Sequence, residues 1–247
     1  MQSSITAKMP QVEFRDLGEI AYQAAWDYQT ALHRQMVENK LANRQLKAGE
    51  YPQTHYLLFV EHPPVFTLGK SGSLENLRLS EAELESKGIS FFPINRGGDI
   101  TFHGPGQIVG YPLLDLDHFF NDVHLYVRNI EEVIIRTVAE YGLEAFRIKE
   151  YTGVWVNSKK GGLGKLCAIG VHLSRWVTLH GWAFNVNNSL DYFDYIIPCG
   201  ITDQDKGVTS LARELNRPVD ILEVKEKLKR HFADVFNCTL INSESYA

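Results

Sequence analysis

One short segment combines residue types that bind ligands with residue types that let a backbone approach them. It reads Arg96-Gly97-Gly98-Asp99-Ile100-Thr101-Phe102-His103. Paired glycines allow close approach to a ligand or a positive φ, which other residues resist. A plain turn needs the glycines but not the arginine, threonine and histidine. The segment therefore predicts a ligand-facing loop between strands expected over 89–94 and 107–114. The alternative is a tight turn with a solvated arginine and a core histidine.

Cys199 is the candidate nucleophile. It stands between Pro198 and Gly200, a rigid and a permissive residue, and this arrangement can present a thiol at a fixed angle. A nearby ammonium would raise its thiolate fraction. An isolated cysteine is more often a small core residue than a nucleophile, and that alternative stays open. Cys167 and Cys238 lie in apolar, strand-like surroundings and are predicted to be structural.

Lys165 follows a glycine-rich run that begins at Gly161. The run is not a phosphate-binding loop, because Lys159 and Leu166 stand where that motif requires glycine and serine or threonine. It is predicted to be a hairpin turn. Lys165 itself opens an alternating strand with one buried face. Because a buried lysine is costly unless it is paired or neutralised, we expect a partner beside it.

The nine histidines show no metal-binding pattern. There is no HExxH spacing and no cysteine pair with zinc-finger spacing, so no metal and no other cofactor is expected. His103 and His180 each precede a glycine and are candidate site residues. The following histidines are predicted to be surface or capping residues: His33, His55, His118, His124 and His231.

Composition narrows the class of protein. The chain has 247 residues, of which 44% are hydrophobic and 22% charged, as in a folded protein with a substantial core. Its net charge of −5 argues against general nucleic-acid binding. No apolar run reaches the length of a membrane span, and the N-terminus lacks a signal-peptide core. Three sparse cysteines are not a disulfide framework, so a cytoplasmic protein is expected.

The hydrophobic pattern predicts a single α+β domain over 11–247, preceded by a loose tail over 1–10. Helices are expected over 19–46, 122–141 and 218–236, and a capping box at Ser80–Glu83 opens a shorter one. The first helix would bury Ile20, Ala24, Tyr28, Leu32 and Met36. Besides the two strands around the glycine-rich segment, strands are expected over 55–60, 65–68, 152–156, 165–173 and 175–186, the last three antiparallel. Residues 191–209 are expected to be mostly loop.

Four motifs in this order resemble the lipoyl(octanoyl) transferases. They are Arg96-Gly97-Gly98 … Thr101-Phe102-His103 … Gln107 … Tyr111, then Lys165-Leu166-Cys167-Ala168-Ile169-Gly170-Val171, His180-Gly181-Trp182-Ala183-Phe184-Asn185-Val186, and Pro198-Cys199-Gly200. The resemblance spans residues 50–215. It implies an α+β fold with a mixed or antiparallel sheet packed with helices, resembling the catalytic domain of biotin- and lipoate-protein ligases.

The resemblance also implies roles for residues. Cys199 would carry the acyl chain as a thioester, and Lys165 would lower the pKa of that thiol. The implied substrate-binding residues are Arg96, Gly97, Gly98, Asp99, Ile100, Thr101, Phe102, His103, Ala168, Ile169, Gly170, Gly181, Trp182 and Ala183. Cys167 and Trp182 replace simpler apolar residues of the family and are expected to reshape the acyl tunnel.

The implied activity is transfer of an octanoyl group from octanoyl-acyl carrier protein to a lysine, the first step of lipoate biosynthesis on protein. The implied acceptors are the apo lipoyl domains of 2-oxoacid dehydrogenases and the glycine cleavage H protein. No ATP is needed. Two alternatives remain: an ATP-dependent lipoate- or biotin-protein ligase, and a non-catalytic module that binds acyl chains.

Overall fold

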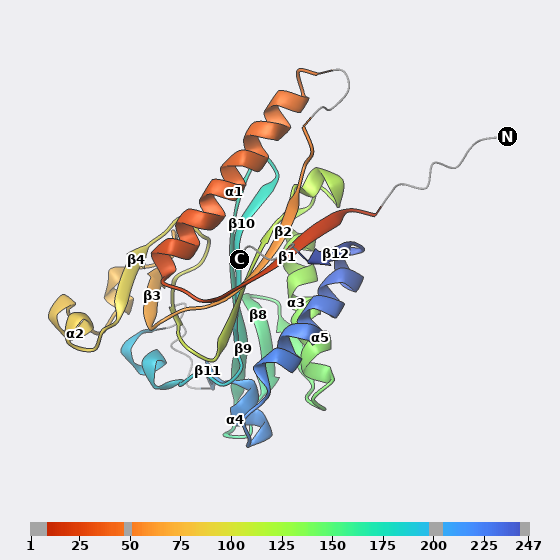
Figure 1. Cartoon of the computed structure of the whole chain (residues 1–247). Coiled ribbons are helices and arrows are strands. Elements are labelled where there is room, and N and C mark those ends of the chain that lie inside the picture. The colour runs from red at the N-terminus through yellow and green to blue at the C-terminus, as the bar shows by residue number, and fades with distance from the viewer. Residues whose placement is uncertain (1–8, 47–50, 198–204, 243–247) are drawn as a thin grey trace.

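A large mixed β-sheet runs through the centre of the molecule (Figure 1). The computed structural model describes residues 9–46, 51–197 and 205–242. The strands of this sheet are β1 (Gln11–Glu19), β2 (His55–Glu61), β6 (Gln107–Leu113), β7 (Ala145–Ile148), β8 (Tyr151–Asn157), β9 (Leu163–Ser174), β10 (Val177–Asn185), β11 (Lys206–Val208) and β12 (Thr239–Asn242). Their order is β12-β1-β2-β6-β10-β9-β8-β7, with β11 beside β9. The pairs β1–β12, β1–β2 and β11–β9 are parallel and the others antiparallel.

A second, three-stranded sheet projects from one side (Figure 1). It consists of β3 (Val65–Leu68), β4 (Ser90–Pro93) and β5 (Ile100–His103), in the order β4-β3-β5. The sequence predicted a loop across all of 96–103, and this is wrong for its second half. Ile100 and Phe102 are buried in an apolar cluster with Phe66, so burial of alternate side chains stabilises a strand there.

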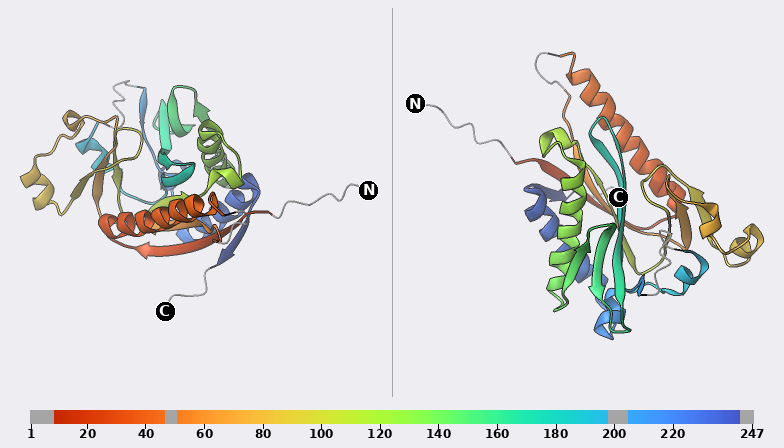
Figure 2. Two further views of the ribbon diagram at one scale, coloured as in Figure 1. Left: turned by 90° about the horizontal axis from the view of Figure 1, so that it is seen from above. Right: turned by 180° about the vertical axis from the view of Figure 1, so that it is seen from behind.

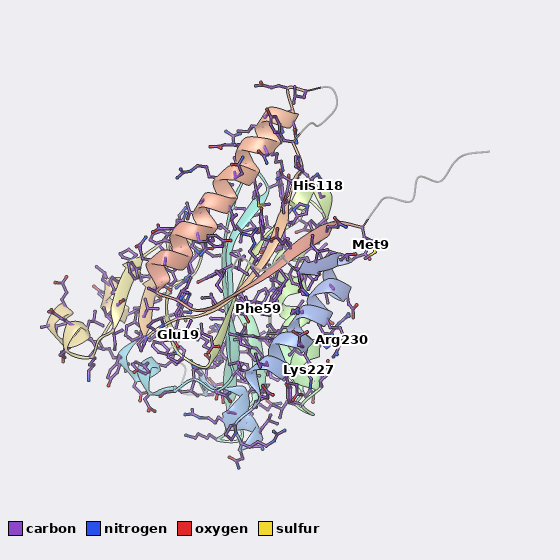
Figure 3. All side chains as sticks on the ribbon, viewed as in Figure 1. Met9, Glu19, Phe59, His118, Lys227 and Arg230 are labelled. Atoms are coloured by element: carbon purple, nitrogen blue, oxygen red, sulfur yellow. The ribbon has the colours of Figure 1, made fainter. Side chains whose placement is uncertain are left out.

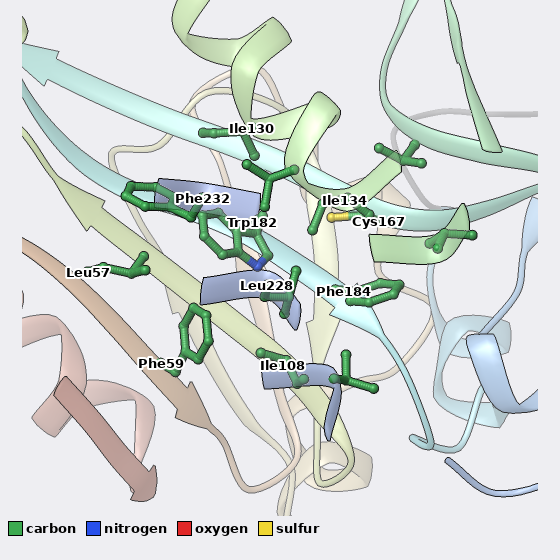
Figure 4. Packing of buried hydrophobic residues seen from close by; sticks show 14 of the residues in the cluster. Leu57, Phe59, Ile108, Ile130, Ile134, Cys167, Trp182, Phe184, Leu228 and Phe232 are labelled. Atoms are coloured by element: carbon green, nitrogen blue, oxygen red, sulfur yellow. The ribbon is translucent and has the colours of Figure 1, made fainter. Parts of the chain in front are cut away.

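Helices cover both faces of the large sheet (Figure 2). α1 (Tyr22–Asn43) lies on one face, and α3 (Val123–Ala139) and α5 (Ile221–Phe236) pack together on the other. Figure 4 shows the main core, which α3 and α5 share with the large sheet. Short helices complete the fold: α2 (Glu81–Ser86), α4 (Leu211–Leu215), η1 (Leu74–Asn76), η2 (Leu116–His118) and η3 (Asp191–Tyr195). The predicted α+β class is confirmed.

The predicted capping box is confirmed, and two longer helices also begin at side-chain caps. The Ser80 hydroxyl and the Glu83 carboxylate form the capping box of α2, and Asp122 and Asp220 cap α3 and α5. Figure 3 shows Lys227 and Arg230 on α5, whose opposite side packs into the core. None of the described helices is both long and apolar enough to cross a membrane.

The first helix differs from its prediction. It begins at Tyr22 because residues 11–19 form β1, a strand that the sequence did not reveal. Its buried stripe includes Ala25 and Gln29, whereas Ala24 is exposed. The apolar pattern did not indicate this face because it includes a polar residue. Gln29 can be buried there because its side chain accepts a hydrogen bond from the backbone of β10. Residues 1–8 of the predicted tail lie outside the described ranges.

Candidate active site

A cavity of about 230 Å³ lies between the two sheets and the start of α1, and we call it the central cavity. It brings together side chains and backbone from three separated segments on β5, β9 and β10. Eleven of the fourteen predicted substrate-binding residues line it, together with Lys165. These eleven are Arg96, Gly98, Asp99, Thr101, His103, Ala168, Ile169, Gly170, Gly181, Trp182 and Ala183.

The other three predicted residues, Gly97, Ile100 and Phe102, do not line the cavity in this structure. Strand alternation explains the last two, because Thr101 and His103 face the cavity while Ile100 and Phe102 face the apolar cluster behind it. The Phe102 ring stacks on a tyrosine of η3 with centroids 4.4 Å apart. The Gly97 N–H donates to a carbonyl of β9 at 2.9 Å. These three residues lie behind the lining residues and support them through packing and a backbone hydrogen bond.

Trp182 and Cys167 pack into the main core (Figure 4). The Trp182 indole lies across Gly110, where an added Cβ would come within 2.2 Å of the ring. Cys167 does not line the central cavity, so the expectation that it reshapes an acyl tunnel is wrong. Burial raises the pKa of its thiol, as expected for a structural cysteine. Cys238 is also buried, and its pKa rises to about 12 for the same reason.

Lys165 is buried at the edge of the central cavity, only 7% exposed. The partner that its burial requires is an aromatic ring: Nζ lies 4.9 Å from the centre of the Trp155 ring. No carboxylate of the described residues forms an ion pair with it. The two residues are cross-strand neighbours, at a point where β8 and β9 change register. The irregular pairing therefore helps to set where Lys165 points.

A buried carboxylate fixes β8 beside Lys165. Glu131 of α3 is fully buried and accepts the Gly153 N–H at 3.0 Å. Its other oxygen binds Arg128 at 2.6 Å and Arg147 at 3.1 Å. An added Cβ on Gly153 would meet a backbone oxygen of β9 at 2.4 Å, so only glycine fits this approach. The available sequence signal was a glutamate on the inward face of an amphipathic helix.

A hydrogen-bonded chain orders the glycine-rich segment. Arg96 donates to the Thr67 carbonyl at 2.7 Å and to its hydroxyl at 3.0 Å, and that hydroxyl lies 3.3 Å from His103 Nε2. The other ring nitrogen, Nδ1, donates to Gln107 Oε1 at 2.9 Å. Burial, followed by the nearby His62, lowers the pKa of His103 well below its ordinary value. His103 is thus a neutral, positioned ring in the wall of the cavity.

His180 holds the opposite wall. Its backbone has a positive φ of 61°, and its main-chain N–H donates to Gln29 Oε1 at 3.1 Å. Its ring Nε2 donates to Asn95 Oδ1 at 2.7 Å. Burial, followed by the charge of Arg96, lowers its pKa to about 3, so the ring is neutral. Its Nδ1 has no partner among the described residues and can accept a hydrogen bond.

The prediction that His55 is a surface or capping residue is wrong. It is buried, it accepts the Asp115 N–H at 3.2 Å, and it contacts His118 at 3.2 Å. Figure 3 places His118 at the end of the sheet away from α2, well apart from the small sheet. Within the described ranges no three histidine, cysteine or acidic side chains gather as a metal site would require.

Cys199 lies outside the described residues. The described residues on either side of it make backbone contacts with the rest of the fold. Ile197 donates its N–H to the Asn76 carbonyl at 2.8 Å, and Val208 of β11 pairs with Lys165. Because Cys199 itself is not described, the approach of its thiol to Lys165 stays a prediction.

Several cavity residues were missed by sequence reasoning. Tyr22 comes from α1 and stacks on His103 with centroids 5.9 Å apart, while Val109 comes from β6. The cavity is also lined by Glu150, Tyr151 and Thr152 at the turn into β8. Polar residues at a strand entrance carry little signal in a single sequence. Only the packing of α1 and β8 against the glycine-rich segment shows their place.

Comparisons with known proteins agree with this geometry. Residues 21–233 match the model of the lipoyl protein ligase A/B catalytic domain. An octanoyltransferase of Flavobacterium johnsoniae is 53% identical over 231 residues, which is 93% of this chain and 98% of that protein. A lipoate protein ligase structure from Thermoplasma acidophilum has a TM-score of 0.67 at 17% identity, covering 95% of this chain and 87% of that one. A biotin protein ligase from Aquifex aeolicus has a TM-score of 0.50 at 15% identity, covering 91% and 70%.

The chain belongs to the lipoyl protein ligase A/B catalytic domain family. Its identity to curated relatives over nearly their whole length places it among the octanoyltransferases, and it is an acyltransferase. The two solved structures share its fold at low identity, which confirms the predicted resemblance of fold.

Proposed function

We propose that this enzyme moves an octanoyl group from octanoyl-acyl carrier protein to a lysine of a lipoyl domain, through a thioester on Cys199. The observation that carries the proposal is the convergence of Lys165 with eleven predicted substrate residues on one cavity. The relatives are named octanoyltransferases, which supports octanoyl as the transferred group. The Thermoplasma acidophilum ligase is described together with its E2 lipoyl domain, which supports the acceptor.

The size of the central cavity suits a medium acyl chain. An apolar cavity of about 150 Å³ can hold the six carbons of benzene. A volume of about 230 Å³ is therefore in the range needed for eight carbons. Burying six or seven methylenes at about 0.8 kcal/mol each gives about 5 kcal/mol of anchoring. This is enough to favour octanoyl over much shorter chains.

The proposed reaction is two acyl transfers. The Cys199 thiolate attacks the thioester carbonyl of the donor and a new C–S bond forms. The bond to the carrier sulfur breaks, and the carrier leaves as a thiolate that takes its proton from the Lys165 ammonium. The amine of the acceptor lysine then attacks the acyl-enzyme, a C–N bond forms, and the Cys199 thiolate leaves. Lys165 as an ammonium stabilises the thiolate, and as a neutral amine it accepts the proton lost by the acceptor. Because a thioester is exchanged for an amide, no nucleotide is required.

The described chain beside Cys199 supports this role for Lys165. Ile196 and Lys206 line a second cavity together with Lys165. Cys199 follows Ile197 by two residues, and two residues span at most about 7 Å. The buried thiols of Cys167 and Cys238 fit a reducing compartment such as the cytoplasm.

The test uses purified protein, octanoyl-acyl carrier protein and an apo lipoyl domain, with no nucleotide. Intact-protein mass spectrometry should detect an octanoyl adduct on the wild type and on Cys167→Ala, and none on Cys199→Ser. Full transfer by Cys199→Ser would exclude the covalent step. Transfer that appears only with ATP and magnesium would instead identify a ligase, and binding without any transfer would identify a non-catalytic module.

A further inference from the structure

A second cavity, of about 420 Å³, adjoins the central cavity and shares Lys165 with it. We call it the basic pocket. Of its twelve described lining residues, five are lysine or arginine and two are aspartate. The basic residues are Arg78, Lys160, Lys165, Lys206 and Arg213. This is a local excess of positive charge in a chain whose net charge is −5.

The two cavities differ in the chemistry they offer. The central cavity balances its charges, with Arg96 and Lys165 against Asp99 and Glu150. The basic pocket does not, and its two aspartates both lie on η3. A ligand that spans both cavities past Lys165 would meet a neutral wall on one side and a positive wall on the other. It should therefore carry an uncharged chain at one end and an anion further along.

Among the described residues no carboxylate pairs with Arg213 or Arg78 of the basic pocket, whereas Lys206 is already paired. Arg213 is half-buried on α4, and no described side chain forms an ion pair or hydrogen bond with its guanidinium. Lys206 binds the exposed Asp205 at 3.2 Å and lies over the Tyr151 ring at 5.2 Å, so its ammonium is held in place. Arg78 donates to the main-chain carbonyl of Asp194 at 3.1 Å, a contact that does not cancel its charge.

We propose that the basic pocket binds the phosphate group of the pantetheine arm that carries the donor thioester. This rests on the proposed function, in which the thioester carbonyl reacts beside Lys165. With the acyl chain in the central cavity, the arm on the other side of the sulfur leads into the adjoining pocket. Guanidinium and ammonium groups are the side chains best suited to phosphate oxygens. Arg213 and Lys206 are the expected ligands, because both are partly buried and fixed by secondary structure.

Three donors separate the parts of the recognised group. Octanoyl-acyl carrier protein has the arm, the phosphate and the protein; octanoyl-coenzyme A has the arm and phosphate without the protein; S-octanoyl-N-acetylcysteamine has neither phosphate nor protein. Acylation rates at sub-saturating donor are measured by intact mass. Arg213→Gln and Lys206→Gln should each lower the rate about ten-fold with the first two donors and leave it unchanged with the third. Arg34→Gln, at an exposed position of α1, is the matched control and should change none.

Other outcomes would overturn the proposal. An equal loss with all three donors would show that the cations act on folding or on the reaction itself. A loss confined to the carrier protein would show that they contact an acidic protein surface instead of the phosphate.

Calorimetry with 4′-phosphopantetheine tests the pocket without turnover. We expect binding to the wild type that Arg213→Gln weakens about ten-fold, and equal binding to both would overturn the proposal. If the wild type transfers no octanoyl group from any donor, the proposed function fails, and this titration still decides the pocket.

Discussion

The ammonium of Lys165 lies over the face of Trp155, with Nζ 4.9 Å from the ring centre. Both side chains are buried and face each other across β8 and β9. A cation held by a ring in a desolvated site gains about 2 kcal/mol, while its full charge remains available. A carboxylate partner would stabilise the lysine equally well but would cancel the field that a thiolate needs. An aromatic partner therefore suits a lysine whose proposed task is electrostatic.

The first prediction concerns this ring. Trp155→Leu should slow acylation about ten-fold, equivalent to about 1.4 kcal/mol of lost cation–π stabilisation, while Trp155→Phe, which keeps an aromatic face, should lose less. Single-turnover acylation followed by intact mass is the measurement. Thermal unfolding must accompany it, because truncating a buried tryptophan costs about 2–4 kcal/mol of stability. Equal rates in the two variants at equal folded fraction would show that the ring does not act through Lys165.

The second prediction concerns the lysine itself. Lys165→Met should slow acylation by at least about a hundred-fold, the lower range for loss of a proton-transfer group. The free energy of unfolding should stay within about 1 kcal/mol or increase, since the change removes a buried charge that has no described ion pair. Urea unfolding and single-turnover acylation check the two parts. A variant that acylates normally and keeps the wild-type pH–rate profile would remove Lys165 from the mechanism.

The third prediction tests the contact between β9 and the glycine-rich segment. At Gly170 an added Cβ would lie 2.7 Å from the Gly97 carbonyl and 2.9 Å from the Arg96 side chain. Gly170→Ala should therefore displace this segment and raise the KM for octanoyl donors about ten-fold, with a change in melting temperature of only a few degrees. Ser174→Ala, further along the same strand, is the control and should leave KM unchanged. An unaltered KM in Gly170→Ala would show that the segment does not shape the acyl site.

The fourth prediction concerns stability in acid. Burial, then His118 and Lys40, lowers the pKa of His55 to about 3, against 6.5 in an exposed chain. Between these values the unfolded state binds a proton that the native state does not, so stability falls as the pH drops below about 6.5. His55→Asn keeps an acceptor for the Asp115 N–H but does not titrate. Near pH 4.5 the free energy of unfolding of His55→Asn should therefore fall less than that of the wild type, by about 3 kcal/mol.

Urea unfolding from pH 7.5 to 4.5 measures this difference. The exposed His124, changed to Asn in the same way, serves as the control and should follow the wild type. Parallel curves for the wild type and His55→Asn would mean that His55 is protonated in the native state.

The sequence alone determined the elements with strong local signals. Strand-like runs predicted β2, β3 and β6, and alternating runs predicted the antiparallel β8, β9 and β10. A capping box predicted the start of α2. The four motifs also contain most of the residues that line the central cavity. These predictions hold because side-chain periodicity and capping depend on residues only a few positions apart.

Only the tertiary structure decided which side chains face the cavity and which residues from distant segments lie beside them. β1 was missed because its alternation is confined to residues 11–15 and its parallel partner β12 lies more than 200 residues away. Ile100 and Phe102 belong to the binding motif but face a buried apolar cluster instead of the cavity, since strand alternation sends neighbours to opposite sides. Sheet register places the Trp155 ring over Lys165, and helix packing places the Glu131 carboxylate on the neighbouring strand β8. Such contacts join distant parts of the chain, and no local pattern encodes them.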